Sequence, residues 1–226
     1  MNRVLYFIGW VLWSVLLRTY NRYTVHGRHH IPPAGTGLLI AANHTSYYDP
    51  PLVGIAFFER IWFLARDSLF TKSKFFGWLI KSVNAVPISR ERLDLKTMRT
   101  VQNLCAQGRK VLIFPEGTRS VDGELQSGLA GVGLFVDKIG ADVLPVCIEG
   151  AYSAFSRHSR WPSPGRIKVN IGEPLRAADW QDLPKGRGRY QHIADDIMAA
   201  IGKLQDETRR NGVPGAACTT INEDTA

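Results

Sequence analysis

The sequence predicts an α/β fold with a mixed, largely parallel central sheet flanked by helices. Short apolar segments alternate along the chain with longer segments of helical periodicity, as is typical of this class. The apolar segments lack the period-two alternation of half-exposed strands, which indicates burial on both faces of a sheet. A chain of 226 residues is long enough for one substantial core and too short for two large domains.

Charge and cysteine content narrow the possible functions. The net charge of +8 favours an anionic partner: nucleic acid, a phospholipid surface or a phosphorylated small molecule. Three cysteines at no metal-ligand spacing indicate a reduced compartment and argue against a disulfide framework. The sequence contains no P-loop, dinucleotide-binding glycine fingerprint or G-x-S-x-G elbow, so a covalent serine mechanism lacks support.

Residues 1–22 are expected to form a membrane-associating helix. Between Arg3 and Arg18 the chain is apolar except for Gly9 and Ser14. The apolar stretch spans about 21 Å as a helix, which is short of the ~30 Å hydrocarbon core of a bilayer. It carries three aromatic residues of the kind that favour the membrane interface, namely Tyr6, Trp10 and Trp13. We expect an embedded or interfacial anchor that does not cross the membrane, and a buried core helix is the alternative.

The α/β domain is expected over residues 23–210, followed by a disordered tail over 211–226. Strands are predicted over 37–42, 61–65, 85–89, 110–114, 143–148 and 167–171. Helices are predicted over 49–58, 68–81 and 128–139, with a further helix before Gly108 and a last one before the tail. The helix before Gly108 is expected to place Leu95, Met98, Val101 and Cys105 on one face. The last helix carries Ile193, Ile197, Ile201 and Leu204 at helical spacing.

The stretch NHTSYYDPP follows the first strand and contains two residues suited to proton transfer. A neutral imidazole at His44 can take a proton from a hydroxyl, and a carboxylate at Asp49 can fix its tautomer. A purely structural interpretation also exists, because an acidic residue before two prolines is typical of a helix N-cap. The two roles need not exclude each other.

A second polar motif, FPEGTRS, follows the strand over 110–114. Gly117 permits a close backbone approach, Thr118 offers a hydroxyl, and Arg119 offers a planar fork suited to phosphate. Glu116 can orient the arginine or accept a hydrogen bond from a substrate hydroxyl. Both motifs follow apolar strands, and ligands of open α/β sheets gather at the carboxyl ends of the strands. Arg90, after the strand over 85–89, is a third group that can reach this edge.

Two other segments carry weaker signals. HGRHH over 26–30 lacks accompanying cysteines or carboxylates, so no metal site is predicted. The segment over 68–81 mixes aromatic residues with lysines, which fits either a membrane-facing surface or an ordinary amphipathic helix.

Taken in order, these motifs resemble the glycerolipid acyltransferase family, specifically the PlsC-like 1-acylglycerol-3-phosphate acyltransferases. NHTSYYD matches the family block N-H-x-S-x-x-D, and FPEGTRS matches F-P-E-G-T-R-S residue for residue. AVPISR, ending at Arg90, resembles the second block, and LPVCI over 144–148 resembles the fourth. The resemblance covers about residues 23–175.

The resemblance implies direct acyl transfer from a coenzyme A or acyl-carrier-protein thioester to the 2-hydroxyl of lysophosphatidic acid, giving phosphatidic acid. It makes His44 the general base and Asp49 its orienting partner. It also assigns substrate binding to one group of residues: Arg90, Glu116, Gly117, Thr118 and Arg119. It implies no metal and no permanently bound cofactor, since the thioester is a co-substrate.

The resemblance further implies three partners: a lysophospholipid acceptor, an acyl thioester donor and a phospholipid membrane surface. The enzyme would be membrane-associated, with its active site on the cytoplasmic side, and no nucleic acid is expected. The chain departs from the family pattern at Gln126, where many members have lysine. An acyltransferase for another lysolipid or for glycerol 3-phosphate, and a catalytically silent lipid-binding protein, are the alternatives.

Overall fold

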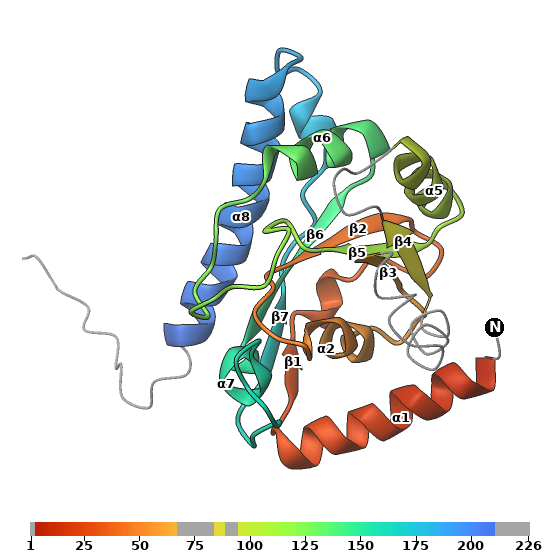
Figure 1. Ribbon diagram of the computed structural model, residues 1–226. Coiled ribbons are helices and arrows are strands. Elements are labelled where there is room, and N and C mark those ends of the chain that lie inside the picture. The colour runs from red at the N-terminus through yellow and green to blue at the C-terminus, as the bar shows by residue number, and fades with distance from the viewer. Residues whose placement is uncertain (1–2, 67–83, 89–94, 211–226) are drawn as a thin grey trace, which may run out of the picture.

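The computed structural model describes residues 3–66, 84–88 and 95–210, and a seven-stranded sheet forms its centre (Figure 1). Three predictions lie outside the described residues: the helix over 68–81, the position of Arg90 and the tail over 211–226. The strand order is β1-β7-β6-β2-β5-β3-β4. The strands are β1 (Thr24–His26), β2 (Leu38–Ala42), β3 (Trp62–Arg66), β4 (Ala85–Ile88), β5 (Lys110–Ile113), β6 (Val143–Glu149) and β7 (Lys168–Ile171).

The sheet is mixed and largely parallel, as the sequence predicts. Strand β2 pairs in parallel with β5 on one side and with β6 on the other, and β3 continues the parallel set between β5 and β4. The exception is β7, which pairs antiparallel with β6 and parallel with β1. The pair β1 and β7 therefore runs opposite to the other five strands.

Both faces of the sheet are covered, as the complete burial of its central strands β2 and β5 shows. All of β2 and β5 is buried, which confirms the inference from their continuous apolar character. Side chains of β2 alternate between two cores: Leu38 and Ile40 point to one, Leu39 and Ala41 to the other. This division follows from the period of two along a strand.

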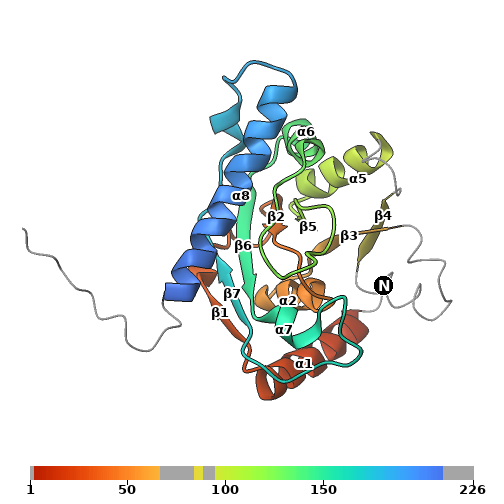
Figure 2. The same cartoon turned by 60° about the vertical axis from the view of Figure 1, so that its left-hand side comes forward.

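Helices occupy both sides of the sheet (Figures 1 and 2). One core includes residues of α1 (Arg3–Tyr20), α2 (Asp49–Ala56) and α7 (Ala151–Phe155). The other includes residues of α5 (Leu95–Ala106), α6 (Ala130–Ile139) and α8 (Arg187–Arg210). Two short 3-10 helices, η1 (Arg28–His30) and η2 (Ala177–Trp180), lie in connecting segments.

Two details differ from the sequence-based expectation. Leu95 begins α5 and is 71% exposed, whereas Val101 of the same predicted face is buried and Met98 and Cys105 pack against the core. Strand β1 is absent from the prediction, because its three residues form an edge strand that is held mainly by pairing with the distant β7. Such a short strand has too little pattern to be recognised locally.

Helix α1 has one packed side and one open side. Leu17 is fully buried in the core, and the Trp13 ring lies edge-on to Tyr48 with 5.8 Å between centroids. Other apolar side chains of α1 are exposed, including Phe7, Leu12, Val15 and Leu16. Among the residues that the structure describes, no helix combines the length and the apolar character needed to cross a membrane.

Candidate active site

The two polar motifs meet at one edge of the sheet because β2 and β5 are parallel neighbours. Ala41 pairs with Ile113, so the chain leaves both strands at the same end and the two following loops lie side by side. The backbone N–H of His44 donates to Glu116 Oε1 at 2.8 Å, and the backbone N–H of Ser120 donates to the His44 carbonyl at 2.8 Å. The convergence expected from the sequence is therefore present in the fold.

His44 and Asp49 form a hydrogen-bonded pair. His44 Nδ1 lies 2.8 Å from Asp49 Oδ2, and the same oxygen accepts the backbone N–H groups of Thr45 and Ser46, each at 2.7 Å. An oxygen that already accepts two amides leaves the ring nitrogen as the donor, so we assign the imidazole proton to Nδ1. The other ring nitrogen, Nε2, is then the one that can accept a proton.

Asp49 does not cap its helix. Helix α2 begins at Asp49 after Tyr48, without a side-chain capping bond. The carboxylate turns back to the amides of the preceding loop instead, which corrects the N-cap interpretation. Pro50 and Pro51 occupy the first turn of the helix, where no amide hydrogen is required. They fix the start of the helix while the Asp49 side chain serves His44.

The environment of His44 restricts its movement. The ring stacks on Phe114 with centroids 3.9 Å apart and an interplanar angle of 15°. Its side chain is 19% exposed, whereas Asp49 is fully buried. One edge of the imidazole can therefore meet a substrate while the carboxylate behind it is shielded from water.

Three residues that the sequence analysis did not single out hold this loop. Asn43 donates to the Ile148 carbonyl at 3.0 Å and accepts from the Ile148 amide at 2.7 Å, which ties the end of β2 to β6. Ser46 Oγ donates to the Phe155 carbonyl at 2.7 Å and accepts the Tyr48 amide at 3.0 Å. Phe114 supplies the stacking surface. The asparagine and serine belong to the N-H-x-S block of the family, so the match to that block was the sequence signal that could have pointed to them.

Glu116 is buried and joins the two loops. Only 3% of the residue is exposed, and burial raises the pKa of its carboxyl to about 7, with a further increase from the Asp49 charge. Hydrogen bonds from the His44 amide and from Gln126 act in the opposite direction and lower this pKa. Within the described part of the chain, no salt bridge joins Glu116 to Arg119. Its carboxyl instead holds the backbone of the loop that carries His44.

The remainder of the second motif is more open. Gly117 and Thr118 are exposed, and Arg119 is half-buried. The guanidinium of Arg119 lies over the Tyr47 ring, 3.7 Å from its centroid, within the range of a cation–π contact. Gly117 has φ of 69°, and a Cβ at this position would lie 2.5 Å from Leu129 Cδ1. The turn therefore favours glycine for its left-handed backbone conformation, and a larger residue would also have to displace the end of the Leu129 side chain.

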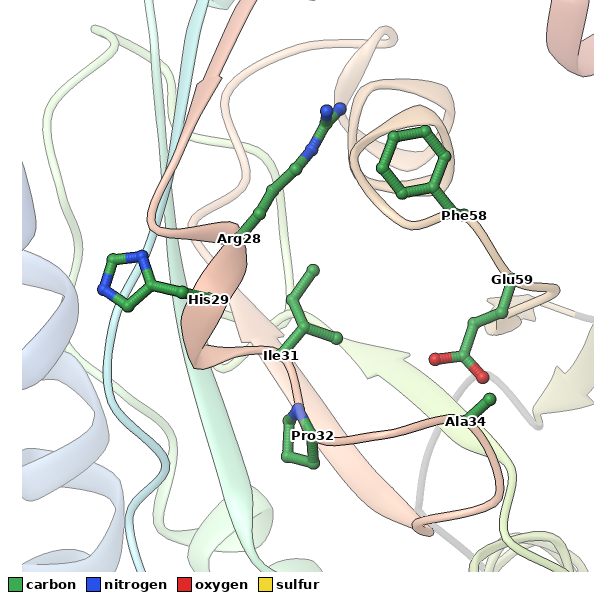
Figure 3. Close-up of a pocket in the computed structure, with 7 residues that line it drawn as sticks. All are labelled: Arg28, His29, Ile31, Pro32, Ala34, Phe58 and Glu59. Carbon is green, nitrogen blue, oxygen red and sulfur yellow. The ribbon is translucent and has the colours of Figure 1, made fainter.

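A separate cavity lies at the opposite edge of the sheet. It has a volume of about 430 Å³, and the segments that line it precede β2 and β3 (Figure 3). Arg28 lies over the Phe58 ring there, 4.5 Å from its centroid. Because His44 follows the carboxyl end of β2, this cavity is not part of the site described above.

The described residues include no cluster of three or more His, Cys, Asp or Glu side chains that could hold a metal ion. The polar groups gathered at the sheet edge instead suit proton transfer, through His44, and the binding of an anion, through Arg119.

Comparison with known proteins places this arrangement in a family. Residues 22–149 match the family model described as Acyltransferase, a region that contains both motifs. The chain therefore belongs to the acyltransferase family. It is 30% identical over 86% of its length to a Bacillus subtilis (strain 168) protein named 1-acyl-sn-glycerol-3-phosphate acyltransferase, and the match covers 94% of that protein. This similarity identifies the chain as a member of the 1-acyl-sn-glycerol-3-phosphate acyltransferase family.

Two further relatives agree. A Chlamydomonas reinhardtii protein named 1-acyl-sn-glycerol-3-phosphate acyltransferase is 29% identical over 69% of this chain, which spans 47% of the algal protein. The crystal structure of PlsC from Thermotoga maritima superposes with a TM-score of 0.69 at 24% identity, covering 90% of this chain and 79% of the other. The second comparison shows that the two proteins share a fold.

Proposed function

We propose that this protein transfers a fatty acyl group from a thioester to the 2-hydroxyl of 1-acylglycerol 3-phosphate and thereby forms phosphatidic acid. The observation that carries the proposal is the His44–Asp49 pair at 2.8 Å, joined by hydrogen bonds to the loop that presents Arg119. Membership in the acyltransferase family and the names of the relatives support the choice of substrates.

The reaction needs one base and no covalent enzyme intermediate. His44 Nε2 takes the proton of the acceptor hydroxyl while the hydroxyl oxygen attacks the thioester carbonyl carbon. Asp49 stabilises the imidazolium that forms and keeps the ring in its orientation. The tetrahedral intermediate collapses with cleavage of the carbon–sulfur bond, and the departing thiolate receives the proton from His44. The products are an ester and a free thiol, and the enzyme returns to its starting state.

The acceptor would be held through its phosphate. Arg119 supplies a planar guanidinium, which pairs well with phosphate oxygens. The exposed Gly117 and Thr118 leave backbone and hydroxyl groups beside it. Glu116 would bind substrate indirectly, because its carboxyl holds the backbone of His44. Arg90 would add a second positive charge, as the family resemblance implies.

We also propose that the protein works at a membrane, with its site on the cytoplasmic side. The exposed apolar side chains of α1 offer a surface of the kind that lies in the bilayer interface. Acceptor and product are amphipathic lipids, so a membrane-bound enzyme meets its substrate where it accumulates. Either acyl-CoA or acyl-carrier protein would serve as the donor, and no permanently bound cofactor or metal is required.

The test is turnover by the full chain purified in mild detergent. Lysophosphatidic acid would be supplied with a long-chain acyl-CoA or with acyl-carrier-protein thioester, and phosphatidic acid would be measured. His44→Ala should lower turnover by about 10²–10⁴-fold, the usual contribution of a general base. A matched control is His192→Ala, because His192 also lies beside a carboxylate, Asp196, at 3.4 Å but is 56% exposed on α8.

Near-normal turnover by a folded His44→Ala protein would overturn the assignment of the base. Product from another lysolipid or from glycerol 3-phosphate, with none from lysophosphatidic acid, would change the acceptor while keeping the reaction class. Lipid binding without turnover of any acceptor would identify a silent binding protein.

A further inference from the structure

The segment between α7 and β7, residues 156–167, has an unusual surface. We call it the α7–β7 loop. Trp161 is 78% exposed, and Arg157, Arg160 and Arg166 are exposed in the same segment. The sequence contains no acidic residue between Gly150 and Gly172. An exposed indole in a segment with three exposed arginines is not explained by the packing of the fold or by the proposed chemistry.

The loop is fastened to the end of α1. Tyr20 Oη donates to the Pro162 carbonyl at 3.2 Å, and Asn21 Nδ2 donates to the Ser163 carbonyl at 3.0 Å. The Ile167 amide also donates to the Asn21 carbonyl at 3.0 Å. In Figures 1 and 2 the loop accordingly runs beside the C-terminal end of α1. Trp161 thus neighbours the helix whose exposed side is apolar.

The adjoining part of α1 extends the same chemistry. Arg18 and Arg22 are exposed, and Tyr20 is 41% exposed. Together with the loop they place five exposed arginines and two exposed amphipathic aromatic side chains at the C-terminal end of α1, the helix that also exposes a series of apolar side chains. Arginine attracts anionic headgroups, while tryptophan and tyrosine favour the boundary between headgroups and acyl chains.

This combination selects one partner. An acidic protein would satisfy the arginines but would not account for the exposed apolar side chains of α1. A bilayer accounts for both, because its headgroups are anionic at the surface and its interior is apolar. We propose that the α7–β7 loop is a second membrane contact, which binds anionic phospholipid headgroups and orients the catalytic domain together with α1.

The position of the loop gives this contact a consequence for the active site. The loop begins directly after Phe155, whose ring lies 5.2 Å from Tyr47. Tyr47 in turn carries the Arg119 guanidinium. A contact through the loop in addition to α1 restrains rotation of the domain about the helix, so the edge that carries His44 and Arg119 keeps one orientation toward the bilayer. The proposal rests on the membrane location in the proposed function and adds the element that fixes this orientation.

Trypsin provides a direct test, since the loop contains exposed arginines. The full chain would be digested with no vesicles, with phosphatidylcholine vesicles, and with vesicles that also contain phosphatidylglycerol. Anionic vesicles should protect the bonds after Arg157 and Arg160, and high salt should remove the protection. The exposed bonds after Lys185 and Arg187 serve as the internal control and should be cut at the same rate throughout. Equal cutting of the loop in all conditions would overturn the proposal.

Charge removal gives the second test. The variant R157Q/R160Q/R166Q should partition on the order of 10²-fold more weakly to anionic vesicles, at roughly fivefold for each arginine near such a surface. The control K138Q/K185Q/R187Q removes the same charge at exposed positions in α6, just before α8 and at the start of α8. These helices cover the opposite face of the sheet, so this control should bind as the wild type does. Trp161→Ala should weaken binding to vesicles of either composition by about tenfold, as expected for about 50 Å² of lost apolar burial at ~25 cal/mol per Å².

Turnover separates this proposal from the proposed function. In detergent micelles the loop variants should acylate lysophosphatidic acid as fast as the wild type, because the active site is intact. If the wild type makes no phosphatidic acid, the proposed function fails, while protection by vesicles still decides the role of the loop. If the charge variant binds vesicles normally but loses acyl-carrier-protein binding, the surface belongs to an acidic protein and the membrane proposal is wrong.

Discussion

The two loops at the active edge of the sheet differ in how firmly the fold holds them. The loop between β2 and α2 is mostly buried, and Asp49, Ser46 and Asn43 all bond its backbone or that of its neighbours. The loop after β5 buries Glu116 but exposes Gly117 and Thr118. Its arginine rests on the ring of Tyr47.

This difference matches the two chemical tasks that the proposed function assigns to the loops. A general base must be held in one geometry, because proton transfer requires hydrogen-bond distance to the reacting hydroxyl. An anion-binding loop must admit a substrate and then close its polar groups on it. The firm loop carries His44, and the open loop carries Arg119. If the comparison is right, variants in the first loop should reduce kcat and variants in the second should raise KM for the acceptor.

The largest effect is expected from Asp49→Asn. An asparagine can still accept the Thr45 and Ser46 amides, but it no longer offers a carboxylate to stabilise the His44 imidazolium. We expect kcat to fall by about 10²–10³-fold, with KM for the acceptor nearly unchanged. Steady-state kinetics on the folded variant would measure this. A fall in acceptor affinity at unchanged kcat would contradict the division of tasks between the loops.

The next effect is expected from Arg119→Ala. Loss of a charged partner of the phosphate should raise KM for lysophosphatidic acid by about 10²-fold, with a smaller change in kcat. Arg119→Lys keeps the charge and removes the planar fork, so it should lie between the two. Exposed Arg176→Ala is the control. Unchanged acceptor saturation in Arg119→Ala would remove this residue from the phosphate site.

A moderate effect on stability is expected from Glu116. Its pKa is about 7 in the folded protein and 4.5 in the ordinary state, so the folded state binds the extra proton between these values. Stability should therefore fall as pH rises from 4.5 to 7, by about 1–3 kcal/mol. Glu116→Gln cannot ionise and should lack this decline, whereas the exposed control Glu173→Gln should retain it. Urea unfolding across this pH range would measure the free energy of unfolding. If Glu116 does not contribute, this free energy would decline in parallel in Glu116→Gln and Glu173→Gln.

The smallest effect is expected from Tyr47. Removing the ring beneath Arg119 in Tyr47→Ala should raise KM for the acceptor by about fivefold, which corresponds to a cation–π contact of roughly 1 kcal/mol. Tyr47→Phe keeps the ring face and should restore KM to within about twofold of the wild type. Equal kinetics for the alanine and phenylalanine variants would show that the ring does not position Arg119.

Much of the fold could be predicted because its strands are buried on both faces. Strands β2, β5 and β6 can be recognised in the sequence as continuous apolar runs, and α2 can be recognised by its Asp-Pro-Pro start. The antiparallel direction of β7 could not be predicted, because the direction of a strand depends on the path of the connecting chain and not on the local sequence pattern. Leu95 fits the helical period of α5, yet it lies at the exposed end of the helix.

The candidate site divides in the same way. His44, Asp49 and Arg119 could be proposed from residue chemistry and from the matched family blocks. The direction of each side chain could not. Asp49 serves the histidine rather than the helix, and Glu116 holds the backbone amide of His44. The stacking of Phe114 on His44 and of Arg119 on Tyr47 joins residues from different loops, and such contacts leave no periodic signal in the sequence.

The junction of α1 with the α7–β7 loop also bears on the order of synthesis. Tyr20 and its partner Pro162 are separated by 142 positions, and the edge strand β1 joins the sheet by pairing with β7. A ribosome making this chain at ~5–20 residues per second releases α1 several seconds before either partner exists. If the protein works at a membrane, as proposed above, the apolar helix is free to meet the bilayer during that interval, before the catalytic domain has folded. Nascent chains stalled before β7 should therefore sediment with vesicles, and recovery in the soluble fraction would refute this order.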